Sequence, residues 1–146
     1  MTGYAGKRGA SAKYSQTSGS EASYATPHRL VQMLMEGALD KIAIAKGAIE
    51  RKDIQVRQDN ITWAISIIDA LCSSLDAEKG GEIAANLFAL YQYMDKRLME
   101  GGLADDVGAL DEVASLLREI KQAWDAMPEY IRHAPNIDEA VSVAEK

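Results

Sequence analysis

The side chains of this sequence that could take part in catalysis or bind a metal are few and far apart. The two histidines are His28 and His133, and Glu129 stands four positions before the second of them. A di-metal site in a helical bundle needs repeated Glu-x-x-His pairs, and this sequence contains none. One Glu–His pair is too little for a zinc site. We therefore predict no metal site.

The other reactive residue types give no support for catalysis either. A cysteine nucleophile needs an exposed thiol beside an imidazole, whereas Cys72 has the apolar neighbours Leu71 and Leu75 and is predicted to be a small buried hydrophobic residue. The pair Gly80–Gly81 lacks the Gly-x-x-x-x-Gly-Lys-Ser/Thr pattern and the preceding strand of a phosphate loop.

A polar stripe formed by Glu82, Asn86 and Arg97 remains. It is better explained by a solvated helix face or by hydrogen bonds between helices than by catalysis. We predict no catalytic residue, no cofactor and no enzymatic activity.

Composition excludes several further classes of protein. The 146 residues carry a net charge of −6, which argues against a nucleic-acid partner because phosphate binding needs a basic face. The sequence has no run of about 18 apolar residues, so we predict no membrane insertion. A single cysteine excludes an internal disulfide and fits a reducing cytoplasm.

The elements that must position these side chains are predicted to be helices. Apolar residues recur at helical spacing through most of the chain, no strand pattern competes, and the breaks between helices are short. These features predict an all-α fold, an antiparallel four-helix bundle. The predicted helices span residues 27–51, 54–75, 82–100 and 106–127.

Local signals set the ends of those helices. Thr26–Pro27 is predicted to begin the first helix and Asp53 to cap the second, while Asp105 or Asp106 caps the fourth. Gly80–Gly81 is predicted to precede the third helix and Gly101–Gly102 to end it, and Pro128 stops the fourth.

Three regions follow from this pattern. Residues 1–25 are rich in Gly, Ser, Ala and Thr and are predicted to be a flexible segment, since they cannot bury enough apolar surface to offset their ordering entropy. Residues 26–128 form the predicted bundle domain, and residues 129–146 form a tail in which a short helix after Asn136 is compatible with the sequence.

The apolar faces of the predicted helices differ in width. The fourth helix has an ordinary face of roughly 120°, whereas that of the second helix extends over roughly 220°. Either such helices touch more than one neighbour, or the excess apolar surface is a groove for a partner helix. If the surplus surface is a groove, the partner-binding residues should lie outside the narrowest apolar strip of each helix that can face the core. The predicted partner-binding residues are Trp63, Ile67, Ala70, Ala84 and Phe88.

Three stretches together resemble one known family. They are TPHRLVQMLMEGAL, SLDAEKGGEIAANLFALYQYMDKRL and ALDEVASLLREIKQAWDAMP, which begin at Thr26, Ser74 and Ala109. Residues 14–128 are similar to the FliS family in the order and spacing of all four helices. Members of this family are cytoplasmic chaperones for flagellin in the bacterial flagellar export system, which is a type III secretion system.

The resemblance implies a function for the apolar surface. A FliS protein binds the C-terminal segment of flagellin, largely as helices on the bundle, and keeps it monomeric and export-competent. The resemblance further implies that the chaperone–client complex meets the export apparatus. It also implies a role in partner binding for Tyr14, because the family carries a tyrosine in a segment like KYSQT.

Two residues depart from the family pattern. Met35 stands where an aromatic residue is usual, which affects the expected shape of the groove, and Ala77 stands where methionine is common. The alternative function is a helical-bundle adaptor or regulator that binds a different partner helix.

Overall fold

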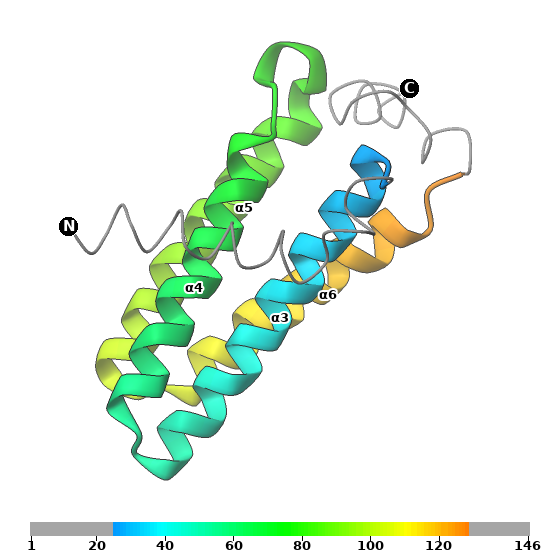
Figure 1. The fold of residues 1–146 in the computed structure, drawn as a ribbon. Coiled ribbons are helices and arrows are strands. Elements are labelled where there is room, and N and C mark those ends of the chain that lie inside the picture. Colours follow the sequence, from blue (N-terminus) through cyan, green and yellow to red (C-terminus); the bar gives the residue numbers. More distant parts are fainter. Residues whose placement is uncertain (1–24, 129–146) are drawn as a thin grey trace, which may run out of the picture.

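A computed structural model describes residues 25–128 of the chain. Within this range the chain forms four α-helices, and the all-α fold predicted from the sequence is confirmed. They are α3 (Pro27–Arg51), α4 (Ile54–Ser73), α5 (Ala77–Ala104) and α6 (Val107–Asp125). Successive helices run in opposite directions along the bundle, as Figure 1 shows. The main contacts join α3 to α4 and α6, and α5 to the same two helices.

The helix starts agree with the predicted caps. Thr26 Oγ1 accepts a hydrogen bond of 3.1 Å from the backbone N–H of Arg29, and Pro27 is the first residue of α3. The Asp53 carboxylate accepts from the N–H of Val56 at 3.2 Å, at the start of α4. At α6 the cap is Asp106. Each cap satisfies one of the N–H groups that the first helical turn leaves without a partner.

The start of α5 differs from the prediction. The helix begins at Ala77, earlier than the predicted 82, and its path is interrupted at Gly81 with φ 58° and ψ −137°. Glycine takes this backbone conformation without a steric penalty. The predicted break at Gly80–Gly81 is therefore present, but a helical turn precedes it.

The predicted end of α5 at Gly101–Gly102 is wrong, because the helix continues through both glycines to Ala104. A Cβ atom on Gly101 would lie 2.6 Å from Cδ1 of Leu110, and one on Gly102 would lie 2.7 Å from Cδ1 of Ile61. Both glycines are buried and allow α5 to approach its two neighbours closely. The chain leaves the helix only at Asp105, whose φ is 52°.

One core fills the space between the four helices. Its largest fully buried side chains come from all of them: Met35, Ile68, Leu71, Met94, Leu98, Leu110, Val113 and Leu117. Met35, the predicted departure from the family pattern, is thus a core residue with an exposed fraction of 1%. It lies within the bundle and not on a surface groove.

A reciprocal pair of contacts ties the start of α3 to the end of α6. The His28 ring nitrogen Nε2 lies 2.6 Å from the carbonyl oxygen of Trp124, and the indole Nε1–H of Trp124 donates to the carbonyl oxygen of His28 at 3.0 Å. The two rings are stacked, with centroids 5.0 Å apart. Both residues are buried, so these hydrogen bonds are shielded from water.

The close packing of α5 predicts opposite effects for two glycine substitutions. Gly101→Ala should lower the free energy of unfolding by about 1–3 kcal/mol, because the new methyl group would overlap Leu110 and lie 3.0 Å from Cβ of Ala109. Gly47→Ala is the control, since its methyl group would meet only the mobile end of Arg51. Alanine favours a helix over glycine by about 1 kcal/mol, so Gly47→Ala should stabilise the protein.

Urea denaturation of the two variants beside the parent protein measures both effects. Equal gains in stability for the two variants would show that α5 does not need close contact at Gly101.

Candidate partner-binding surface

An apolar cleft of about 450 Å³ lies between the end of α4 and the start of α5. Its lining residues are mostly apolar: Cys72, Ser73, Leu75, Ala84, Ala85 and Phe88. The Phe88 side chain is 53% exposed at the edge of the cleft, although a large aromatic ring gains free energy when it is buried. Ala84 is only 2% exposed, so it belongs to the floor of the cleft.

Local structure explains why the cleft forms at this place. The turn between the helices carries a hydrogen bond of 2.9 Å from the N–H of Glu78 to the Asp76 carboxylate, and the kink at Gly81 follows within the first turns of α5. Small residues at Ala84 and Ala85 then leave room next to Phe88.

Cys72 borders this cleft and packs against the core, as predicted for a small hydrophobic residue, but it is half-buried and not buried. Its Sγ atom lies 3.6 Å from the amide Nε2 of Gln92 on α5, within reach of a weak hydrogen bond. The thiol therefore contributes a soft, polarisable surface to the wall of the cleft.

The predicted partner-binding residues of α4 lie on the other flank of that helix. The ammonium Nζ of Lys41, on α3, lies 3.7 Å from the centre of the Trp63 ring, which places Trp63 at the boundary between α3 and α4. At about 100° per residue, Ile67 and Ala70 share that flank, whereas Cys72 lies about 180° away from Trp63. The predicted residues of α4 thus lie on the flank of that helix away from the cleft, so they do not share one groove with Phe88.

Burial further divides the residues near Trp63. Ala70 is exposed and Trp63 is half-buried, but Ile67 is only 4% exposed and belongs to the core. The expectation that Ile67 and Ala84 lie outside the core faces is therefore wrong in the unbound protein. The broad apolar face of α4 is explained in part by contacts with more than one neighbour, which was the first of the two readings.

Arg97, one residue of the polar stripe on α5, takes part in a contact between helices. The carboxylate of Glu112, on α6, accepts hydrogen bonds from Nε of Arg97 at 2.7 Å and from the hydroxyl of Tyr93 at 2.9 Å. These two donors hold the pKa of Glu112 below its usual range, and the contact with Glu112 raises the pKa of Tyr93. Arg97 also pairs with Glu100 on its own helix, and its ion pair with Glu112 joins α5 to α6.

Other chemistry has little basis in residues 25–128. This part of the chain contains no group of three or more His, Cys, Asp or Glu side chains that could hold a metal ion. None of its helices is long and apolar enough to cross a membrane. Tyr14, Glu129 and His133 lie outside the described residues, as do the predicted flexible segment and tail.

The fold and its surface define an all-helical bundle with an apolar cleft, and comparison with known proteins places it in a family. The family model described as flagellar protein FliS matches residues 10–130. The chain belongs to the FliS family, which confirms the resemblance seen in the sequence.

Curated relatives agree with this assignment. The chain is 48% identical to the flagellar secretion chaperone FliSB of Pseudomonas aeruginosa over 107 residues, which cover 73% of this chain and 85% of the relative. It is 44% identical to FliS of Salmonella typhimurium over 101 residues (68% and 75%) and 40% identical to FliS of Vibrio cholerae over 109 residues (75% and 80%). Both of these are also named flagellar secretion chaperones.

Proposed function

We propose that this protein is a chaperone that binds the C-terminal segment of flagellin, prevents its premature polymerisation and keeps it competent for export. Membership of a family of flagellar secretion chaperones supports the role, and the resemblance of the sequence to that family suggests flagellin as the client. The structural observation that carries the proposal is the apolar cleft bordered by Phe88.

The chemistry of the cleft suits an amphipathic helix. Helix-in-groove recognition uses a few apolar anchor side chains that enter a hydrophobic depression. Full burial of one such side chain contributes about 1.5–3 kcal/mol, so three anchors supply enough for micromolar binding after the cost of association. The cleft has room for an anchor next to Phe88, and the surface near Trp63 and Ala70 could receive a second helical piece of the same client.

The cleft is open in the unbound protein, which fits transient binding. A client that must be released for export needs a surface that is accessible from outside the bundle. A cavity enclosed by the core would release its ligand only when the core opens. The half-exposed ring of Phe88 meets this requirement, whereas the buried Ile67 does not.

Size-exclusion chromatography of the protein with flagellin tests the proposal. Full-length flagellin should co-elute with this protein, and flagellin that lacks its C-terminal segment should not. Flagellin shortened at its N-terminus is the matched control and should still co-elute. Undiminished co-elution after removal of the C-terminal segment would contradict the proposal, and binding of an unrelated protein in place of flagellin would favour an adaptor with another partner helix.

A further inference from the structure

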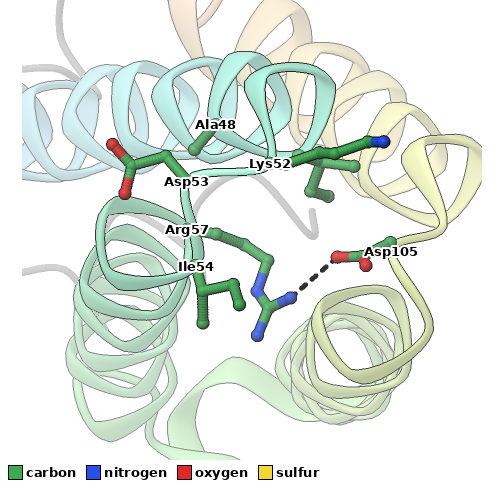
Figure 2. A pocket seen from close by; sticks show the side chains of 7 residues that line it. Ala48, Lys52, Asp53, Ile54, Arg57 and Asp105 are labelled. Carbon is green, nitrogen blue, oxygen red and sulfur yellow. Dashed lines mark hydrogen bonds and ion pairs between the residues drawn. The ribbon is translucent and has the colours of Figure 1, made fainter.

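A second pocket lies at the end of the bundle that contains the α3–α4 and α5–α6 turns. It has a volume of about 260 Å³ and is lined by residues of both turns and of the adjoining ends of α3 and α4: Ala48, Ile49, Lys52, Asp53, Ile54, Arg57 and Asp105. Figure 2 shows the Arg57 side chain extending from α4 towards Asp105 in the α5–α6 turn. The proposed chaperone function makes no use of this pocket.

The guanidinium of Arg57 is only partly used. Its Nη1 atom lies 2.7 Å from Oδ1 of Asp105, and its side chain is 15% exposed. Within the described part of the chain, the buried Nε–H of Arg57 has no hydrogen-bond acceptor. A buried donor without an acceptor is costly, which makes this atom a place where an added acceptor would be bound.

The unused edge has a defined shape. The guanidinium of arginine offers two parallel N–H bonds along two of its edges, and one of these edges is formed by Nε and Nη2. Because Asp105 takes Nη1, the Nε–Nη2 edge is left for a second carboxylate, which reaches the buried Nε when the exposed side chain of Ile54 turns aside. In Figure 2 this edge lies on the side of Ile54.

The rest of the pocket supplies an apolar wall and one further charge of each sign, on Lys52 and Asp53. Ala48, Ile49 and Ile54 are aliphatic, and the Ile54 side chain is 67% exposed. Lys52 adds an ammonium group, and the Asp53 carboxylate already accepts a hydrogen bond from the N–H of Val56 as the cap of α4.

From these features we infer that this pocket binds a carboxylate joined to an aliphatic group about the size of a leucine side chain. The carboxylate accepts hydrogen bonds from Nε and Nη2 of Arg57, and the aliphatic group packs against Ile49 and Ile54. A free small carboxylic acid and the C-terminal residue of a polypeptide share this chemistry.

N-acetyl-leucine is the probe, and N-acetyl-leucinamide is its control without a carboxylate. Titration of the full-length protein is followed by NMR through the Nε–H signal of Arg57 and the methyl signals of Ile54. We expect a saturable shift of both signals with the acid, and binding of the amide that is about tenfold weaker or less because the charge-assisted hydrogen bonds are lost. A hexapeptide that ends in a leucine carboxylate should bind more tightly than the probe if the natural ligand is a polypeptide C-terminus, and no more tightly if it is a free acid.

Two variants separate the effect of the paired N–H donors of Arg57 from the effect of its positive charge. Arg57→Lys keeps a cation but has no Nε–Nη2 edge, and it should weaken binding of N-acetyl-leucine about tenfold or more. Arg118→Lys makes the same change at an exposed position on α6 and should bind the probe like the parent protein. The melting temperature of each variant is measured alongside.

The proposal is overturned if the acid produces no saturable shift up to its limit of solubility, if the amide binds equally well, or if Arg57→Lys binds unchanged. Flagellin is absent from these titrations, so their outcome is independent of the chaperone proposal.

Discussion

Phe88→Glu should weaken the binding of a flagellin C-terminal peptide by about tenfold to a hundredfold. The replacement removes an apolar anchor worth about 1.5–3 kcal/mol and puts a charge at the edge of the cleft. Because Phe88 is 53% exposed in the unbound protein, its loss should change the free energy of unfolding by no more than about 0.5 kcal/mol. Fluorescence anisotropy of a labelled peptide measures the binding, and urea denaturation measures the stability.

Leu103→Glu is the matched control for that experiment. Leu103 is 84% exposed on the same helix but does not line the cleft, so the same charge at this position should leave peptide binding nearly unchanged. Equal losses in the two variants would point to general charge repulsion and would remove Phe88 from the binding surface.

Ile67→Glu would not test partner binding, although the sequence predicts Ile67 to be a partner-binding residue. Because Ile67 is 4% exposed, a glutamate there would place a charge in the core and destabilise the bundle. Loss of binding in that variant would therefore report on folding, which makes Phe88 the better test.

Trp124→Ala should lower the free energy of unfolding by about 3–5 kcal/mol, the largest effect on stability that we expect from one substitution. The indole is 6% exposed, and its removal would empty a core site, separate the stacked rings and leave the carbonyl of His28 without its donor. The loss is comparable to the whole stability of a small domain, so Trp124→Phe is needed as a second variant. It keeps an aromatic ring but loses the N–H, and should cost about 1 kcal/mol for the hydrogen bond alone.

Trp63→Ala provides the comparison, since the chain contains only these two tryptophans. Trp63 is half-buried, so its removal should cost much less. Midpoints of urea denaturation rank the three variants. If Trp63→Ala were as destabilising as Trp124→Ala, the His28–Trp124 contact would not have the special role in closing the bundle that its geometry indicates.

The sequence predicted those features of the fold that depend on residues close together along the chain. The bounds of the first helix and the caps at Thr26 and Asp53 follow from side chains that bond to the backbone within one turn, and of the two candidates for the cap of α6 the structure selects Asp106. The end of α5 could not be predicted in this way. Gly101 and Gly102 have the local signature of a helix end, but their effect depends on Leu110 and Ile61, which meet them only in the folded bundle.

The candidate site shows the same limit. A wide apolar face indicates that a helix contacts more than one neighbour or a partner. It does not indicate which neighbour each flank of the helix contacts. Trp63 and Phe88 were therefore expected in one groove, although the first lies against Lys41 of α3 and the second borders a cleft between α4 and α5. Nothing in the sequence indicated that Arg57 lines a pocket. A basic residue near the start of a helix is usually solvated, and the contact with Asp105 exists only in the folded bundle.

The alternating direction of the helices gives the molecule two unlike poles. The start of α3, the end of α4, the start of α5 and the end of α6 lie at one pole, and the α3–α4 and α5–α6 turns lie at the other (Figure 1). The cleft next to Phe88 lies between α4 and α5 on the side of the first pole, and the Arg57 pocket lies at the second. Along α4, Arg57 and Cys72 are separated by about 22 Å at a rise of 1.5 Å per residue. A leucine-sized ligand in the pocket would thus not reach a helix in the cleft, and the protein could hold both at once. Any influence of one ligand on the other would have to pass through a shift of α4 or α5 along its length.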